Sequence, residues 1–332
     1  MTTTSTSRLG HIRTLAALSA AALALAGLAG CGDSDDSNES AGGSGGSGKK
    51  VVQFVNPLPS YPTWKQIGDC MKDEAAKRGL DYKESGSSGQ AIDASAMITQ
   101  VQQATANKVD AIITFPTSDG FGQVLKQAQE ADIVTGTIYG DGTPESGADY
   151  NIGPDFTLIG ETVINAVSAE PGDHVVGMVA AQDTGLGKAW LDGIKAAAAE
   201  TDNVSIVGEV YTADDAAKAL PQVTALLTAH PDITDIVTHM GTTTPGATAA
   251  IKAQGREGET FLVPLGVDNG GLEAIKDGTA KVMLLQNVCT LGQQMMDGVA
   301  DQLEGKTPPV VPVELKAVTA DQVETFVDQG WS

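Results

Sequence analysis

The sequence predicts an α/β protein with two doubly wound lobes, each a parallel sheet covered by helices on both faces. Two observations predict this class. From Val51 onward, short apolar runs alternate with longer segments of helical spacing, which is typical of parallel strands buried on both faces. The alternation pauses after Ile138 and resumes at Thr157, so the pattern occurs twice. The 332 residues also suffice for about two domains.

The first half begins with a short apolar strand, and its boundaries follow from local signals. The helix that starts at Trp64 ends before Gly79, a residue that favours helix termination, and Pro116 stops the second strand. Strands are expected at 51–55, 109–115 and 133–138, and helices at 64–78, 91–106 and 121–131.

The second half repeats the alternation over a longer stretch. Strands are expected at 174–180, 204–210, 233–239, 261–267, 282–287 and 310–318, and helices at 157–168, 186–200, 216–229, 245–254, 272–277 and 291–303. Ligands of such sheets bind at the carboxyl ends of the strands. Two lobes that face each other would therefore hold a ligand in the cleft between them.

The charge balance excludes one large class of partner. The chain has 42 acidic and 20 basic residues, a net charge of −22, so its surface repels nucleic-acid phosphates. Hydrophobic residues make up 41% of the chain, which is enough for sizeable cores and excludes whole-chain disorder.

The N-terminus has the features of an export signal. Arg8, His11 and Arg13 precede an apolar stretch at 15–29 that is too short for an ordinary spanning helix. Leu28-Ala29-Gly30-Cys31 resembles the bacterial lipoprotein box, which implies a signal peptide at 1–30 and lipidation of Cys31. A plain signal peptide is the alternative.

A flexible tether is expected at 31–50 because this stretch is rich in Gly, Ser and Asp and poor in apolar residues. The mature protein would then be held at the extracytoplasmic face of the cell membrane through its lipid anchor only.

Several motifs of the body resemble type I periplasmic solute-binding proteins of the ribose/galactose-binding-like branch. The motifs are VDAIITFPTSD at 109–119, IGPDFTLIG at 152–160, LGVDNGGLEAIKDG at 265–278, and Gln286 after the next strand. The resemblance covers about residues 51–318. It implies a monomer without cofactor or catalysis that captures a small-molecule ligand and delivers it to the permease subunits of an ABC importer.

The same resemblance implies a three-segment hinge between two lobes. The N-terminal lobe would comprise 51–153 plus 287–312, and the C-terminal lobe 154–286 plus 313–332. Ligand binding would close the hinge, because a ligand favours closure only by contacting both lobes. A receptor-only chemosensory binder is an alternative. An extracytoplasmic enzyme is another, but the sequence shows no nucleophile or acid–base pair for it.

Ligand-binding positions follow from matching the loops at the strand ends to those of the family. They are Tyr61, Trp64, Tyr139, Phe156, Trp190, Asp215, Met240, Thr242, Asp268 and Gln286. Alternative roles are open for Trp64, which can pack in the core, and for Asp268, which can cap a helix. His239 closes a strand at the same edge and either contacts ligand or has a structural role.

This chain departs from the sugar-binding pattern in the side chains that hold hydroxyl groups. Tyr139-Gly140 stands where sugar binders often have Asp-Arg, and Met240-Gly241-Thr242 replaces an Asn-Asp pair. Five of the 14 aromatic residues fall on loops or helix starts at the strand ends: Tyr61, Trp64, Tyr139, Phe156 and Trp190. Each unpaired sugar hydroxyl would cost about 1–3 kcal/mol. The pattern therefore favours an aromatic or nucleoside-like ligand, with an ordinary sugar or polyol as the alternative.

Two cysteines remain if Cys31 carries lipid. Cys70 and Cys289 both belong to the expected N-terminal lobe, and an extracytoplasmic location permits a disulfide between them. Two buried thiols are the alternative. No His or Cys recurs at the spacing of metal ligands, so no metal is expected.

Overall fold

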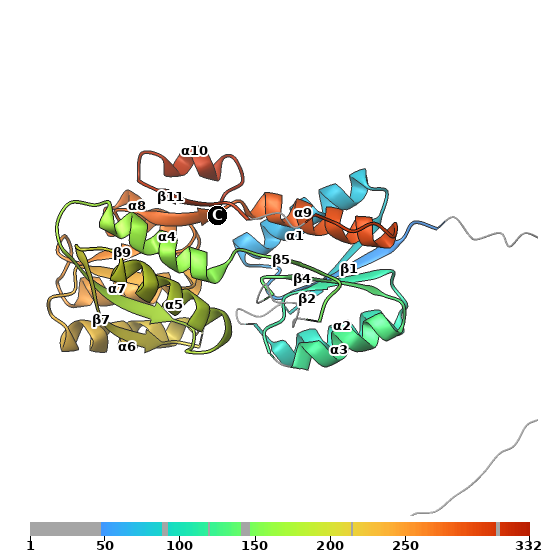
Figure 1. The fold of residues 1–332 in the computed structure, drawn as a ribbon, viewed down its shortest axis with the longest axis horizontal. Helices are drawn as coiled ribbons and strands as arrows, with labels where there is room; N and C mark the ends of the chain where they lie inside the picture. Colours follow the sequence, from blue (N-terminus) through green and yellow to red (C-terminus); the bar gives the residue numbers. More distant parts are fainter. Residues whose placement is uncertain (1–47, 88–91, 119, 141–146, 214, 310–312) are drawn as a thin grey trace, which may run out of the picture. The chain divides into compact units, whose positions relative to one another are not determined.

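The computed structural model describes residues 48–87, 92–118, 120–140, 147–213, 215–309 and 313–332. The expected signal peptide, Cys31 and nearly all of the expected tether lie outside these ranges. Among the helices within them, none is both long and apolar enough to cross a membrane. The described body is an α/β structure with two lobes, as the sequence predicts (Figure 1).

The first lobe is built on a five-stranded sheet in which all neighbouring strands are parallel. Its strand order is β2 (Asp81–Gly86), β1 (Val51–Asn56), β3 (Ala111–Thr114), β4 (Val134–Ile138) and β5 (Tyr150–Ile152). One face is covered by α1 (Pro62–Lys77) and α9 (Val288–Leu303), and the other by α2 (Ala94–Ala106) and α3 (Gly120–Glu130) (Figure 1). β3 is buried throughout, which explains its unbroken apolar sequence.

The second lobe is built on a parallel sheet with an antiparallel extension. The parallel order is β7 (Val204–Tyr211), β6 (His174–Ala180), β8 (Asp235–Thr238) and β9 (Phe261–Val263). A bridge between Leu265 and Leu284 leads to β10 (Met283–Gln286), which pairs antiparallel with β11 (Leu315–Val318).

Two pairs of helices cover this second sheet. α4 (Phe156–Ser168) packs on α5 (Gly185–Ala199), and α6 (Ala216–Ala229) packs on α7 (Thr244–Ala253). Successive residues of β6 belong to different buried clusters: Met178 to the cluster with α4 and α5, and Val179 to the cluster with α6 and α7. Because successive strand residues point to opposite faces, the two helix pairs lie on opposite faces of the sheet.

Some sequence predictions need correction. β2 and β5 were not predicted, because β2 (DYKESG) is a largely exposed edge strand and β5 has only three residues. The last strand is shorter than the predicted 310–318 and is antiparallel rather than parallel. The helix predicted from residue 91 begins at Ala94, where the Asp93 carboxylate accepts a hydrogen bond from the amide of Ala96.

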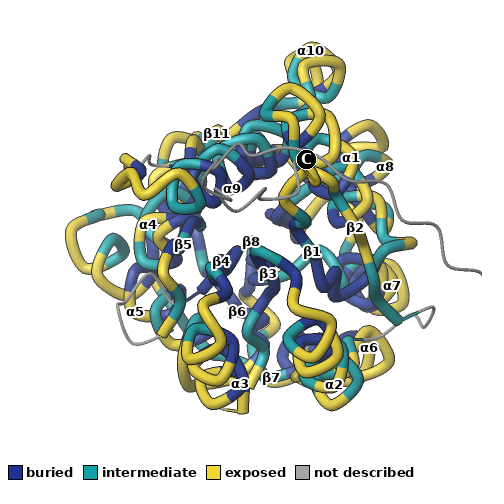
Figure 2. The backbone as a smooth tube through the Cα atoms, turned by 90° about the vertical axis from the view of Figure 1, so that its right-hand side faces the viewer, coloured by how far each residue is buried: buried dark blue, intermediate teal, exposed yellow. Residues whose placement is uncertain are grey.

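The chain passes between the lobes three times, as the predicted hinge requires. The passages connect β5 to α4, β10 to α9, and α9 to β11, and the last one includes residues 310–312, which are outside the described ranges. One buried hydrophobic cluster contains residues of both lobes. Figure 2 shows the central strands β3 and β8 buried and the outer faces of the helices exposed. The two lobes are therefore in contact through apolar side chains.

Candidate ligand-binding site

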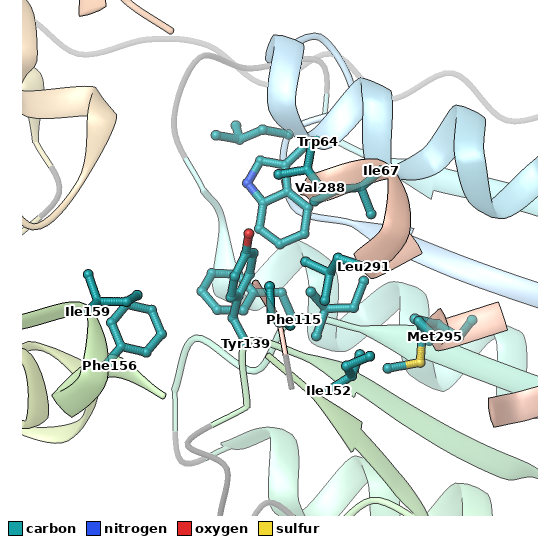
Figure 3. Packing of buried hydrophobic residues seen from close by; sticks show 14 of the residues in the cluster. Trp64, Ile67, Phe115, Tyr139, Ile152, Phe156, Ile159, Val288, Leu291 and Met295 are labelled. Atoms are coloured by element: carbon teal, nitrogen blue, oxygen red, sulfur yellow. The ribbon is translucent and has the colours of Figure 1, made fainter. Parts of the chain in front are cut away.

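A row of aromatic rings runs from the first lobe into the second, and we call it the ring chain. Its members in order are Trp64, Phe115, Tyr139, Phe156, His239 and Trp190. Neighbouring centroids lie 5.2 to 6.3 Å apart. Figure 3 shows Trp64, Phe115 and Tyr139 together, with Phe156 facing them from α4. The ring chain crosses between the lobes where Tyr139 meets Phe156, at 6.3 Å.

The first-lobe rings lie at the start of a helix and just after two strands. Trp64 lies in the first turn of α1, where Pro62 is the first helical residue, and is only 7% exposed. Phe115 follows β3 and Tyr139 follows β4. The carboxyl ends of these parallel strands lie side by side, which brings the rings together.

Tyr139 has an unusual backbone conformation that Gly153 accommodates. Its φ is 50°, in the left-handed region that bulky residues rarely adopt. Its amide donates to the carbonyl of Ile152, and a Cβ atom on Gly153 would lie 3.0 Å from the Cα of Tyr139. Strain of this kind concentrates at functional sites. The first passage between the lobes thus fixes the position of this ring.

The second-lobe rings are positioned by a close helix crossing. Phe156 is the first residue of α4, after an Asp155 cap, and Trp190 lies in α5. A Cβ atom on Gly160 would lie 2.3 Å from the carbonyl oxygen of Trp190, and one on Gly193 would lie 2.1 Å from that of Thr157. Only glycine at both positions permits this approach, which sets Phe156 and Trp190 on either side of His239.

His239 and Trp190 are buried without hydrogen-bond partners for their polar atoms. His239 is 3% exposed and Trp190 is fully buried. Neither imidazole nitrogen, nor the indole Nε1, has a partner among the described residues. Burial alone lowers the pKa of His239 to about 4, so its ring is neutral at pH 7. Each such atom costs about 1–3 kcal/mol, so these buried groups call for a partner that the described residues do not supply.

Gln286 joins the ring chain through Tyr139. The Tyr139 hydroxyl donates to Oε1 of Gln286 over 3.0 Å, and both residues are buried. Burial raises the pKa of Tyr139, which keeps its hydroxyl protonated as a donor. Gln286 ends β10 immediately before the second passage between the lobes. The bond therefore connects the residue after β4 of the first lobe to the last residue before the second passage.

Asp268 connects the lobes rather than capping a helix. Its Oδ2 accepts hydrogen bonds from both the backbone amide and the hydroxyl of Thr63, in α1. The following helix, α8 (Gly271–Lys276), is preceded by Gly270, and no side chain caps it. The helix-cap alternative for Asp268 is therefore wrong. Burial raises the pKa of the Asp268 carboxyl, and the bonds from Thr63 oppose that rise.

A second link between the lobes lies beside Asp268. The side-chain amide of Asn269 donates to the Tyr61 hydroxyl over 3.1 Å, and the Tyr61 hydroxyl oxygen lies 3.0 Å from where a Cβ on Gly241 would be. Tyr61, one of the predicted ligand-binding residues, precedes α1. Asp268 and Asn269, which are adjacent in the second lobe, thus both bind residues at the start of α1.

The remaining predicted positions have different surroundings. Met240 and Thr242 follow β8, at the short helix η2 (Gly241–Thr243), and the Thr242 hydroxyl is buried without a partner among the described residues. Asp215 is exposed and caps α6, accepting a hydrogen bond from the amide of Ala217. Asp119, the last residue of the VDAIITFPTSD motif, lies outside the described ranges.

Phe115 and Thr63 were absent from the predicted site, although each had a detectable signal. Phe115 directly follows a predicted buried strand, at the edge where ligands of doubly wound sheets bind. Thr63 lies between two predicted residues, Tyr61 and Trp64.

Positive charge is missing from this arrangement. The ring chain, Gln286, Thr63, Tyr61 and Asn269 include no Lys or Arg, and Asp268 is the one acidic residue beside them. A buried anion without a cationic or hydrogen-bonding partner is strongly disfavoured. The arrangement is therefore suited to an uncharged solute.

A disulfide fastens the helix pair behind the ring chain. Cys70 of α1 and Cys289 of α9 are bonded, with their Cα atoms 5.3 Å apart. One turn further along α9, a Cβ atom on Gly292 would lie 2.6 Å from the carbonyl oxygen of Ile67. The disulfide and this close approach hold α9 against α1, and so hold the passage that follows Gln286.

Comparisons with known proteins agree with the fold. The family described as "Periplasmic binding protein domain" matches residues 51–307, which is most of the chain. The chain therefore belongs to the periplasmic binding protein family. A search of curated protein sequences found no match.

Solved structures with the same fold come from several bacteria. A periplasmic ribose ABC transporter protein of Conexibacter woesei is 24% identical, with a TM-score of 0.72 over 85% of this chain and 95% of that one. GanP, a glucose-galactose binding protein of Geobacillus stearothermophilus, is 18% identical, with a TM-score of 0.76 over 83% and 99%. A solute-binding protein of Burkholderia graminis in complex with D-arabinose is 21% identical, with a TM-score of 0.73 over 82% and 96%.

Proposed function

We propose that this protein is the solute-binding component of an ABC importer, held by a lipid on Cys31 at the extracytoplasmic face of the membrane. The observation that carries the proposal is the ring chain, which is buried, crosses between the lobes, and ends in polar atoms without partners. A ligand that contacts both lobes favours their closure, and a closed form can be distinguished by a permease. The proposal keeps the lobe boundaries expected from the sequence, 51–153 plus 287–312 and 154–286 plus 313–332.

The ligand is an uncharged cyclic compound, and a monosaccharide or polyol is the first candidate. The structural neighbours include proteins described with ribose, glucose-galactose and D-arabinose. Sugar rings have an apolar face that packs on aromatic side chains, and Asp268, Gln286 and Thr242 can bind hydroxyl groups. Binding, not catalysis, is what this arrangement supports.

An aromatic or nucleoside-like solute is the second candidate. Six rings form the row between the lobes, and two of the positions where sugar binders carry polar pairs hold Tyr139-Gly140 and Met240-Gly241 here. A flat ligand would bury its faces against these rings and require fewer hydrogen bonds.

A thermal-shift panel on residues 49–332 tests the proposal. One half would contain sugars and polyols, including D-ribose, D-galactose, D-glucose and D-arabinose, and the other half nucleosides, bases and aromatic acids. A ligand at 100 times its dissociation constant stabilises the folded state by about 2.7 kcal/mol, which raises the midpoint by several degrees. A hit among the sugars selects the first candidate and a hit among nucleosides or bases the second, whereas no hit in either half contradicts the proposed function.

A further inference from the structure

His239 and Trp190 form a polar pair that the fold does not satisfy. Their rings lie 5.3 Å apart, at the second-lobe end of the ring chain. Trp190 Nε1 and both nitrogens of His239 are buried and have no hydrogen-bond partner among the described residues. The contrast with His174 is clear, since its Nδ1 lies 2.8 Å from Asp235 and its Nε2 lies 3.2 Å from the Glu170 carbonyl oxygen.

A purely structural role explains this pair poorly. A histidine that only fills space leaves two polar atoms unpaired, whereas leucine would fill similar volume without that penalty. The position of His239 is also significant, because it directly follows β8, at the carboxyl end of a central strand. The hydroxyl of Thr242, three residues later, is likewise buried without a partner among the described residues.

We propose that His239 and Trp190 are specificity-determining residues that bind the polar edge of an uncharged ligand. The Trp190 indole can only donate, so it faces an acceptor oxygen or nitrogen of the ligand. The neutral His239 ring has one donor and one acceptor, which suits a hydroxyl, or an amide-like edge that also presents both. This inference rests on the proposed function and names how its ligand is selected.

The residues around His239 and Trp190 determine which ligand charge the site accepts. Phe156 of α4 and Trp190 of α5 pack against the His239 ring, and burial lowers its pKa with no contribution from a charged group of the described residues. A carboxylate or phosphate bound here would find no Lys or Arg among the residues of the ring chain. We therefore expect the site to reject the anionic form of an otherwise acceptable ligand.

Two substitutions with matched controls test the pair. His239→Leu removes both nitrogens at similar volume, and His230→Leu is its control, because His230 is the half-buried C-terminal cap of α6. Trp190→Phe removes the indole N–H, and Trp331→Phe is its control, because Trp331 is buried in the other hydrophobic cluster. Calorimetric titration would use D-galactose with D-galacturonate, and adenosine with its 5′-monophosphate, together with any panel compound that binds.

We expect His239→Leu to weaken ligand binding without lowering the stability of the ligand-free protein. His239→Leu should keep or raise the unfolding midpoint of the ligand-free protein and weaken binding of the neutral probe by about tenfold or more, the effect of one lost hydrogen bond. Trp190→Phe should also weaken binding, whereas both controls should bind within about twofold of wild type. The neutral member of each probe pair should bind at least about tenfold more tightly than its anionic partner.

Three outcomes would overturn the inference while leaving the proposed function intact. They are wild-type affinity in His239→Leu, a lower midpoint of the ligand-free His239→Leu protein, and tighter binding of an anionic probe than of its neutral counterpart. Failure of every compound to bind the wild-type protein would instead contradict the proposed function itself, and the inference with it.

Discussion

The backbone amide of Thr63 donates to Oδ2 of Asp268 over 3.0 Å, although the two residues are 205 positions apart. Thr63 belongs to α1 of the first lobe, and Asp268 follows the last parallel strand of the second lobe. The Thr63 hydroxyl donates to the same carboxylate oxygen, so the contact is charge-assisted. Because the bond spans the lobes, it can form only while they are together, and it stabilises the contact between them.

Asp268→Ala is therefore expected to abolish ligand binding without unfolding the protein. The substitution removes the acceptor for two donors of α1 and leaves the amide of Thr63 without this partner. Titration calorimetry measures the affinity, and circular dichroism checks the fold. Asp232→Ala, which changes an exposed aspartate in the same lobe, should bind normally. Wild-type affinity in Asp268→Ala would remove this residue from the site.

Acidification should destabilise the protein through His239. Its pKa is lowered by burial from 6.5 to about 4, so between these values the unfolded chain binds a proton that the folded protein does not. The stability is thus complete above about pH 6.5 and declines as the pH falls towards 4, by up to roughly 3 kcal/mol.

The matched comparison isolates this histidine from the carboxylates, which also titrate at low pH. Urea unfolding of wild type and His239→Leu at pH 7 and pH 4.5 should show a smaller loss of stability in the variant. Equal losses in the two proteins would mean that His239 does not stay neutral when folded.

Gly160→Ala should destabilise the second lobe and disturb its rings. The new Cβ would lie 2.3 Å from the carbonyl oxygen of Trp190 and 2.8 Å from the amide nitrogen of Ile194, both backbone atoms that cannot move independently. Forced separation of α4 and α5 should cost about 1–3 kcal/mol or more. Gly122→Ala is the control, because Gly122 lies in α3 with no atom near its added Cβ.

Chemical denaturation can measure both glycine variants. We expect Gly122→Ala to gain about 0.5–1 kcal/mol, since alanine favours a helix more than glycine does. Gly160→Ala should also weaken ligand binding, because Phe156 and Trp190 come from the two separated helices. A Gly160→Ala protein as stable as Gly122→Ala would contradict the close crossing.

Loss of the disulfide should destabilise the first lobe. The bond closes a loop of 219 residues, for which the chain-entropy account gives about 5 kcal/mol at most, and measured effects are typically about 2–4 kcal/mol. Thermal unfolding of the Cys70→Ser, Cys289→Ser double variant should show a lower midpoint, and reduction of the wild-type protein should reproduce it. An unchanged midpoint would show that packing at Gly292 is sufficient to hold α9 on α1.

The sequence predicts the fold well where burial leaves a periodic pattern. β1 and β3 are short apolar runs, and α1 ends just before Gly79, whose positive φ is typical of a helix end. β2 could not be predicted in this way, because an exposed edge strand has no apolar pattern. The antiparallel pairing of β11 was equally hidden, since pairing direction depends on chain path and not on composition.

The site was predictable as a set of positions but not as a set of contacts. Matching the strand-end loops to those of the family predicts four aromatic ligand-binding residues, and the structure brings all four into one row: Trp64, Tyr139, Phe156 and Trp190. The bond from Thr63 to Asp268 has no local signal, because it depends on how two lobes meet. His239 was recognised only as a candidate, because its unpaired nitrogens are a property of packing.

The disulfide between α1 and α9 has a consequence for the order of folding. The first lobe is completed by a helix that begins at Val288, after the entire parallel sheet of the second lobe in the chain. During synthesis or export from the N-terminus, one face of β1 to β5 therefore lacks α9 and is covered only in part, by α1, while the second lobe emerges and can already fold. Oxidation of Cys70 with Cys289 is the step that closes the sequence, and an oxidant that acts earlier would find Cys70 without its native partner.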